Sequence, residues 1–440
     1  MPRFPFNLSR YFIAAALLIL TAAALQAKTA MMQPRQPNRL SITDVGAVGD
    51  GQTLNTTQIQ AAIDQLAVKG GGTLEIPHGV FLSGAIFLKP GVNLYLEEGA
   101  VLRGSTEVKD YPKMMTRIEG HSEEWLPAFI NADKVDHLRI SGSGVLDGSG
   151  APFWKEFWDR RKGTNLTNLG VPRPRPMFIQ NSKDVQISGI SLTNSAFWNL
   201  HLYRCKNVVV ENADFEALHL RPPNRAPSSD AIDVDSCQRV TVRGCTFAIG
   251  DDCVCLKGSK GPFAMQDKDS PPTEHILVTG CTFKAGDGAV TLGSEATVIR
   301  DVVVENCSVT GIMPLVRIKV RPDTPQDYED IHYRSITLTG GGAIFEFRPW
   351  TQFFDLQGQP APKSVVKNIT VSDIKGSANS FGEIIGKPET AISDITLKNF
   401  DVQLKNGNLK TVNVKNLKTK NVKVNGSLFS VNPAGEKKSP

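Results

Sequence analysis

The string RVTVRGCTF at residues 239–247 recurs as HILVTGCTF at residues 275–283 and as DVVVENCSV at residues 301–309. Each copy alternates apolar and polar residues, which is typical of a half-buried β-strand. Related strings begin near six residues separated by 23, 32, 36, 26 and 29 positions: Asp184, Asn207, Arg239, His275, Asp301 and Asp330. Repeats of this length indicate a solenoid or a propeller. The uneven spacing, the Asn and Gly at the corners and the lack of a Trp-Asp signature favour an all-β parallel β-helix, with a β-sandwich as the alternative.

The cysteines support the repeat rather than a disulfide framework. All seven lie in the strand-rich middle of the chain, and Cys245, Cys281 and Cys307 occupy the same place in the three strings. A stacked interior position suits Cys as a small hydrophobe. No His pair accompanies them at ligand spacing, so the sequence predicts no metal site there.

One helix is predicted before the repeats. Ile59, Ala62, Ile63 and Leu66 follow the i, i+3, i+4, i+7 pattern of an apolar helical face. Asn55 or Thr56 is expected to cap its start, and Gly70–Gly72 to end it. We expect this helix to plug the open end of the solenoid, which otherwise exposes its core.

The first residues have the pattern of a targeting segment. Arg3 and Arg10 flank or precede the apolar stretch Tyr11–Leu25, and small residues follow it, as in a secretory signal peptide. A single-pass anchor is the alternative, and export predicts a periplasmic or extracellular location. The expected organisation is a signal peptide over 1–27, a leader over 28–40, the β-helix domain over 41–430 and a polar tail over 431–440.

The net charge of +5 is misleading, because the segment 404–440 alone carries eight Lys and one Glu. With Arg3 and Arg10 also set aside, the body over 28–403 has a charge of about −4. A nucleic-acid-binding body is therefore not indicated.

Acidic residues concentrate in SSDAIDVDSCQRVTVRGCTFAIGDDCVCLK, residues 228–257. Its five Asp are Asp230, Asp233, Asp235, Asp251 and Asp252. We interpret Asp233 and Asp235 as turn or ladder residues, and the other three as a chemical cluster on neighbouring coils about 4.8 Å apart. Three carboxylates on one surface repel one another and raise the pKa of at least one.

Asp251 and Asp252 are adjacent in the sequence, which restricts the backbone geometry between them. Successive strand residues face opposite ways, so Asp251 and Asp252 reach the same surface only if the backbone turns there. Gly250 permits such a turn.

A cationic stripe follows in PLVRIKVRPD, residues 314–323. Arg317 and Lys319 are two apart and share a strand face, and Arg321 is expected to continue it. Such cations suit an anionic sugar, because Arg pairs bidentately with a carboxylate.

Three segments interrupt the repeat: 104–127, 147–176 and 258–272. They are long and irregular, and we expect loops that wall a binding groove. Trp154 and Trp158 on the second segment suit sugar stacking or packing against the scaffold.

Four motifs in order resemble glycoside hydrolase family 28, the polygalacturonase and rhamnogalacturonan hydrolase family. The family pattern is Asn-Thr-Asp, Gly-Asp-Asp, Gly-His-Gly and Arg-Ile-Lys. This chain shows Ser228–Asp230, Gly250–Asp252, Gly286–Gly288 and Arg317–Lys319. The resemblance implies a right-handed parallel β-helix that hydrolyses pectin with inversion of configuration and without a cofactor or metal.

The resemblance also implies roles for the residues. Asp251 resembles the general acid, Asp230 and Asp252 resemble the pair that activates water, and Arg317 and Lys319 resemble the binders of the galacturonate carboxylate. We therefore expect an exported, monomeric enzyme that acts on pectic polysaccharide or oligosaccharide, with an exo mode suggested by the long loops.

The chain departs from the family pattern at two places. Asp287 stands where the third motif has His, and GAIFEFRPW offers Glu346, Arg348 and Trp350 where the family has a late Tyr. These changes leave a rhamnogalacturonan substrate open.

Two other kinds of protein also remain open. A Ca²⁺-dependent pectate-lyase-like β-helix could use the Asp cluster as a metal site, and the missing His makes a non-catalytic glycan-binding β-helix plausible. His201 is expected either to line the groove or to pack in a strand, and His275 to be structural.

Overall fold

The computed structural model describes residues 38–217 and 225–430. The expected signal peptide, nearly all of the leader and the polar tail lie outside the described residues. Among the described residues, no helix is long and apolar enough to cross a membrane.

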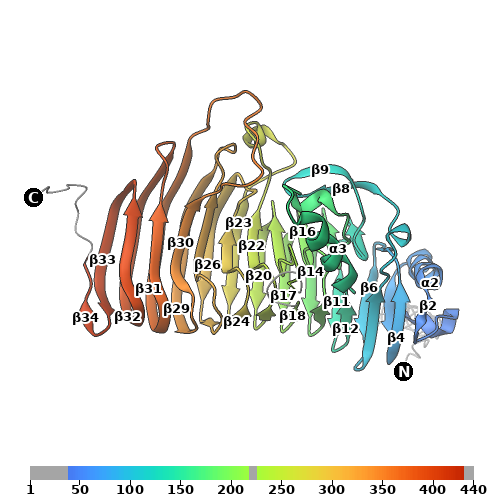
Figure 1. Cartoon of the computed structure of the whole chain (residues 1–440). Helices are drawn as coiled ribbons and strands as arrows, with labels where there is room; N and C mark the ends of the chain where they lie inside the picture. The colour runs from blue at the N-terminus through green and yellow to red at the C-terminus, as the bar shows by residue number, and fades with distance from the viewer. Residues whose placement is uncertain (1–37, 218–224, 431–440) are drawn as a thin grey trace, which may run out of the picture. The chain divides into compact units, whose positions relative to one another are not determined.

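The strands form parallel stacks, with each strand paired to its equivalents on the coils before and after it (Figure 1). Sheet A consists of β5 (Ile86–Leu88), β10 (Ile130–Asp133), β13 (Met177–Gln180), β16 (Leu200–Tyr203), β19 (Ile232–Asp235), β22 (Asp252–Lys257), β25 (Gly288–Leu292), β28 (Val316–Val320) and β30 (Ala343–Pro349). Sheet B consists of β1 (Arg39–Ser41), β3 (Gly72–Ile76), β6 (Val92–Leu96), β11 (Arg139–Gly142), β14 (Lys183–Ser188), β17 (Lys206–Glu211), β20 (Gln238–Arg243), β23 (Thr273–Thr279) and β26 (Val298–Glu305). Sheet C consists of β2 (Asp50–Leu54), β4 (Gly79–Ser83), β7 (Ala100–Gly104), β12 (Val145–Asp147), β15 (Ser191–Thr193), β18 (Asp214–Glu216), β21 (Thr246–Ala248), β24 (Thr282–Ala285) and β27 (Ser308–Val309). The predicted parallel β-helix is confirmed.

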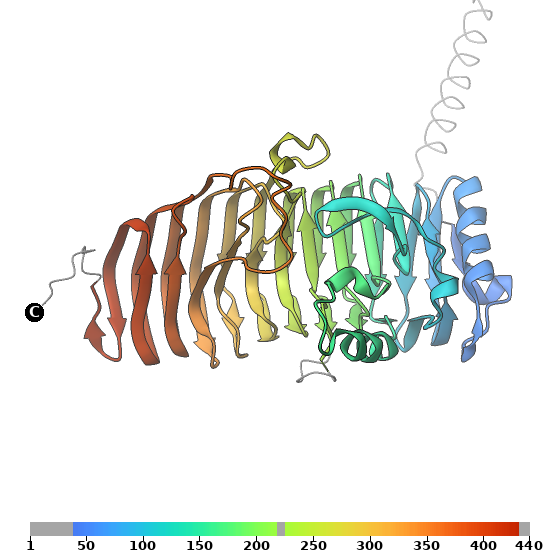
Figure 2. The same cartoon turned by 45° about the horizontal axis from the view of Figure 1, so that its top comes forward.

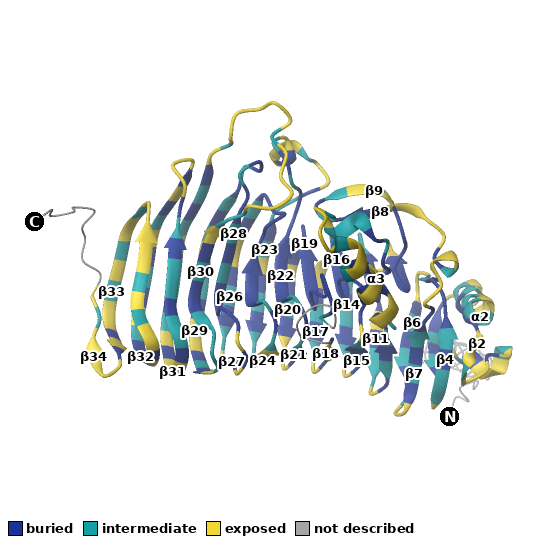
Figure 3. Cartoon of the chain, viewed as in Figure 1, coloured by how far each residue is buried: buried dark blue, intermediate teal, exposed yellow. Residues whose placement is uncertain are grey.

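The last coils have longer strands. They are β29 (Asp327–Thr339), β31 (Ser364–Ile385), β32 (Thr390–Val412) and β33 (Val414–Val424), followed by the short antiparallel β34 (Ser427–Leu428). Exposed residues are prominent on β32 and β33, whereas the inner faces of the middle coils are buried (Figure 3).

The repeat starts found in the sequence are corners of the solenoid. Each of the six has a positive φ between 52° and 59°, the left-handed region that Asn and Asp adopt more readily than other non-Gly residues: Asp184, Asn207, Arg239, His275, Asp301 and Asp330. The corners are also linked between coils, since the Asn207 amide donates to the Asp184 carboxylate at 2.8 Å. His275 lies at one of these corners and pairs with Asp301 at the surface.

Stacked side chains fill the interior. Phe247 lies between Phe215 and Phe283 with ring centroids 5.3 and 5.2 Å apart. All seven cysteines are free and buried, among them Cys245, Cys281 and Cys307, for which a stacked interior position was predicted.

The predicted helix is α2 (Thr56–Val68), and it lies at the N-terminal end of the solenoid (Figure 2). Ile59, Ala62, Ile63 and Leu66 are its buried residues. Asn55 occupies the N-cap position but makes no capping bond, because its side chain bonds to Val48 and Thr53 instead.

Two of the irregular segments contain regular structure, so their interpretation as loops was wrong. The first holds an antiparallel hairpin of β8 (Met114–Ile118) and β9 (His121–Trp125). The second holds α3 (Ala151–Arg161), with Trp154 donating to the Ser195 carbonyl at 2.8 Å and Trp158 to the Arg225 carbonyl at 2.7 Å. The two Trp therefore pack against the scaffold. Single turns of 3-10 helix complete the elements: η1 (Ile42–Val45), η2 (Val108–Asp110), η3 (Asn168–Gly170) and η4 (Ala264–Gln266).

Candidate active site

The outer face of sheet A brings the sequence motifs together. Cα partners connect one row of residues across five strands in the order Asp233, Cys255, Thr291, Arg317 and Glu346. Side chains on such a row point the same way because the coils are in register. Acidic and basic motifs far apart in the sequence therefore meet on one surface.

The backbone turns at the start of β22, as the adjacent carboxylates required. Cys253 and Val254 both lie in the core, so strict alternation is broken there. The Asp252 amide donates to Asp251 Oδ1 at 3.0 Å. Gly250 is needed for space rather than for its φ, because a Cβ would lie 2.2 Å from the Ala226 carbonyl oxygen.

Asp252 is held by the cationic stripe. It is fully buried, and its Oδ1 accepts from Thr291 Oγ1 and Arg317 Nη1, each at 2.7 Å, while Oδ2 accepts from Lys319 Nζ at 2.5 Å. Burial works to raise the pKa of Asp252, but Lys319 and Arg317 outweigh it and hold the pKa well below the usual range. Asp252 is therefore ionised.

The neighbouring Asp251 has the opposite tendency. Burial, followed by the charges of Asp230, Asp287 and Asp252, raises its pKa to about 8. Adjacent carboxyl groups, one neutral and one ionised at pH 7, have the division of labour that acid–base hydrolysis requires.

Asp230 belongs to a buried cluster around Lys257. The ammonium nitrogen lies 3.5 Å from Asp230, 3.5 Å from Asp233 and 3.3 Å from Glu295. It also lies 4.5 Å from the centroid of the Trp198 ring. Burial raises the pKa of Asp230, and burial and the charge of Asp230 raise that of Asp233.

Sequence reasoning missed most of this cluster. Asp233 was interpreted as a turn or ladder residue, yet it lies in a strand and is 0 % exposed at the site. Lys257 closed the acidic stretch in the sequence, and a lysine at a strand end beside so many Asp was a signal for a buried ion pair.

A second buried cluster surrounds Asp235, also interpreted as a turn or ladder residue. Arg117 of β8 donates to it from Nε at 2.8 Å, and His201 Nε2 lies 3.4 Å away. Arg175 Nη1 is 2.6 Å from His201 Nδ1. Burial lowers the pKa of His201 to about 3, so this His is a neutral packed residue rather than a groove residue.

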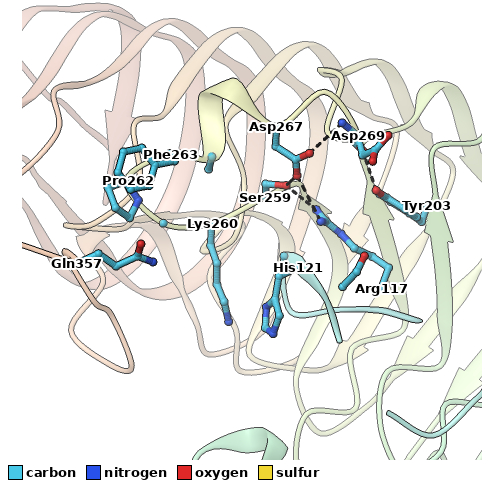
Figure 4. A pocket seen from close by; sticks show the side chains of 14 residues that line it. Arg117, His121, Tyr203, Ser259, Lys260, Pro262, Phe263, Asp267, Asp269 and Gln357 are labelled. Carbon is cyan, nitrogen blue, oxygen red and sulfur yellow. Dashed lines mark hydrogen bonds and ion pairs between the residues drawn. The ribbon is translucent and has the colours of Figure 1, made fainter. Parts of the chain in front are cut away.

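The hairpin and the segment 258–272 wall a pocket of about 360 Å³ (Figure 4). Arg117, Tyr203, Lys260, Phe263 and Asp267 are among the residues that line it, so both segments contribute to the wall of this pocket. None of the five predicted catalytic and substrate-binding residues lines this pocket. The carboxylate site is therefore a separate feature of the same face.

Arg321 does not continue the cationic stripe, contrary to expectation. Strand β28 ends at Val320, and Arg321 then pairs bidentately with Asp323 at 2.8 and 2.9 Å. Its Nη1 also lies 3.5 Å from Glu295.

The residues that differ from the family pattern lie next to the site. Asp287 forms an ion pair with Arg225, and its amide donates to the Asp251 carbonyl at 2.8 Å. Glu346 accepts from Arg317 Nε at 2.9 Å. Trp350 lies with its ring centroid 5.0 Å from Lys319 Nζ.

The donors near the cluster do not suit Ca²⁺. Oxygen and sulfur atoms of Asp230, Asp252 and Cys255 lie within 4.8 Å of one another. Ca²⁺ takes six to eight oxygen ligands, whereas this group includes a thiol and a carboxylate already bound by Arg317 and Lys319. The arrangement does not support the lyase alternative.

Comparisons with known proteins agree with this geometry. The model of "Glycosyl hydrolases family 28" matches residues 67–427. The chain is 26 % identical over 376 residues to a probable polygalacturonase of Vitis vinifera, which covers 83 % of this chain and 74 % of that protein. It is 26 % identical over 417 residues to an exo-poly-alpha-D-galacturonosidase of Dickeya chrysanthemi, covering 80 % of this chain and 64 % of that protein.

A solved structure shows the same fold. The exopolygalacturonase of Thermotoga maritima has a TM-score of 0.77 and 23 % identity, and the match covers 91 % of this chain and 96 % of that one.

Proposed function

The chain belongs to glycosyl hydrolases family 28 and is a glycoside hydrolase of O-glycosyl bonds, and from that premise we propose that it cleaves α-galacturonosyl linkages of pectin by inverting hydrolysis. Similarity to polygalacturonases and exopolygalacturonases supports the substrate class and an exo mode. The predicted signal peptide supports export, and we expect a monomer.

The observation that carries the proposal is the opposite ionisation of two adjacent carboxyl groups. Asp251, whose pKa is raised to about 8, is neutral at pH 7 and can donate its proton to the leaving oxygen. Asp252 stays ionised because Lys319 and Arg317 outweigh the effect of burial.

The nucleophile is a water molecule in this proposal. Carboxylate oxygens of Asp230 and Asp252 lie within 4.8 Å of each other, so one water can hydrogen-bond to both. Inverting glycosidases place such a water opposite the bond that the acid protonates. Arg317 and Lys319 orient Asp252 and keep further N–H donors for the substrate carboxylate.

A rhamnogalacturonan substrate is the second candidate, and Glu346 is the observation that favours it. Its carboxylate occupies Arg317 Nε at 2.9 Å. A carboxylate at this place repels an acidic sugar and accepts hydrogen bonds from the hydroxyls of a neutral one.

Product analysis on homogalacturonan and on rhamnogalacturonan, side by side, tests the proposal. Inverting hydrolysis releases new reducing ends in the β configuration at first, observed by proton NMR before the anomers equilibrate, and exo action releases short products only. Asp251→Asn is the matched control and should release product at least about 10²-fold more slowly. An unsaturated, UV-absorbing uronide would establish elimination instead, and binding without release of reducing ends would establish a non-catalytic protein.

A further inference from the structure

A closed set of contacts surrounds the peptide of Asp251. Arg225 Nε donates to the carbonyl of Gly250, the residue before it, at 2.7 Å. On the other side, the Asp287 amide donates to the carbonyl of Asp251 at 2.8 Å. The Arg225 guanidinium and the Asp287 carboxylate then join each other in an ion pair. The two residues thus hold the backbone of Asp251 from both sides.

Both members are themselves anchored. The carbonyl of Arg225 accepts a hydrogen bond from Trp158 Nε1 of α3 at 2.7 Å. Asp287 stands between two tightly packed glycines: a Cβ at Gly286 would lie 2.7 Å from Cys253 Sγ, and one at Gly288 would lie 2.8 Å from Asp252 Oδ1. Residue 287 is therefore fixed against the acidic pair by backbone packing.

We propose that Arg225 and Asp287 are positioning residues for the general acid Asp251, which they hold through its flanking carbonyls and whose charge they set. The proposal deepens the function proposed above and rests on Asp251 being the acid. Asp287 stands where the family motif has a His, so this chain uses a carboxylate–guanidinium pair beside its acid.

The charges around Asp251 make the two roles separable. The Asp287 carboxylate works to keep Asp251 protonated, whereas cations favour its ionised form. The charged groups that face Asp251 come from several elements: Asp230, Asp252, Asp287, Arg173, Arg225, Arg317 and Lys319. Because Arg225 partly neutralises Asp287, the ion pair sets how strongly the carboxylate acts on the acid.

Two substitutions separate the electrostatic effect of the ion pair on Asp251 from its effect on the position of Asp251. Asp287→Asn keeps the hydrogen bond from the backbone N–H of residue 287 to the Asp251 carbonyl but removes the negative charge of the side chain. The pKa of Asp251 should therefore fall by about one unit or more. The basic limb of the kcat/KM profile should then move to lower pH by the same amount. Arg225→Lys keeps the cation but cannot reach both partners, so kcat should fall about tenfold while the limb stays in place.

A remote acidic residue supplies the control. Asp301 is an exposed partner of His275 on the outer surface, and Asp301→Asn removes the same charge without touching the site. It should leave kcat, the pH profile and the melting temperature unchanged.

The pKa of Asp251 is read independently of turnover. The ¹³C signal of its carboxyl carbon, identified by its loss in Asp251→Asn, is titrated in the full-length wild type and in each variant. If the wild type releases no product from either polymer, the proposed function fails, but this titration still decides the role of the pair. The proposal is overturned if Asp287→Asn leaves the carbon titration where it was, or if Arg225→Lys moves the limb as far as Asp287→Asn does.

Discussion

Replacement of Lys257 with methionine tests the buried cluster that contains Asp230. Lys257 is buried, and its ammonium lies between 3.3 and 3.5 Å from Asp230, Asp233 and Glu295. Methionine keeps most of the volume and can pack on the Trp198 ring, so the change removes mainly the charge. Removal of one partner from a buried ion pair typically costs about 3–5 kcal/mol, or roughly 4–6 °C in melting temperature for a domain of this size.

The loss should depend on pH, with a defined sign. Lys257 works to lower the pKa values of Asp230 and Asp233, which burial already raises. Without it the folded-state pKa values rise further, while the unfolded carboxyls still ionise near pH ~4. The carboxyls of the folded wild type ionise at lower pH than those of the folded variant, so between the two folded-state values the deficit of the variant grows by about 1.4 kcal/mol per retained proton and pH unit. Lys257→Met should therefore be close to wild type near pH ~4.5 and far less stable near pH ~8.

Melting temperatures from circular dichroism across this pH range provide the assay. Lys155→Met is the matched control, because Lys155 pairs with Asp159 on the exposed face of α3 at 2.5 Å, where solvent screening leaves such a pair with little effect on stability. The reasoning is refuted if the two variants lose the same stability, or if the deficit of Lys257→Met does not grow with pH.

Three other substitutions test the site and the core. Glu346→Gln should lower KM for oligogalacturonate about tenfold, because it removes the negative charge beside Arg317 that repels a substrate carboxylate; an unchanged KM would show that the pair does not select the sugar. Asp251→Asn should reduce kcat by about 10²–10⁴ and yet melt above wild type. That gain should grow between about pH 4 and pH 8, because the wild-type carboxyl, with a pKa raised to about 8, stays protonated in the folded state while the unfolded one ionises; a gain that shrinks with pH would contradict this. Phe247→Ala should cost about 3–5 kcal/mol, because its ring lies in the stack between two others; a loss below about 1 kcal/mol in thermal unfolding would mean that the coils repack.

The fold was predictable because equivalent positions on successive coils of a solenoid carry similar residues, so the repeat is visible in the sequence. The Cys of VTVRGCTF and its copies marks an interior position, whereas Asp184 and Asn207 mark the corners of the coils. Local repetition decided the architecture, and each coil had only to match its neighbours. The segment that contains α3 was interpreted as a loop, because it has no equivalent on the other coils. No repeated string was therefore available to indicate its secondary structure.

The site was predictable in part for the same reason. Motif order and coil stacking brought Asp230, Asp251 and Asp252 together with Arg317 and Lys319. The buried residues that contact this site were harder to predict. The sequence pattern of an outward-facing strand residue is the same whether water or a loop covers that residue. Asp233 alternates like a residue of an exposed strand face, and the one sequence signal for its burial was Lys257, whose ammonium lies 3.5 Å from it.

The cationic pair has a more constrained role than its sequence suggests. Arg317 and Lys319 together carry two positive charges, and Asp252 and Glu346 already balance them within 2.9 Å. A uronate that binds there adds an uncompensated negative charge to a largely buried place, which is unfavourable unless further donors meet it. Each cation does retain N–H donors, since guanidinium has five and ammonium three. The charge of the sugar beside Arg317 therefore depends on Glu346, which shares that guanidinium with Asp252, and the sequence motif alone does not determine it.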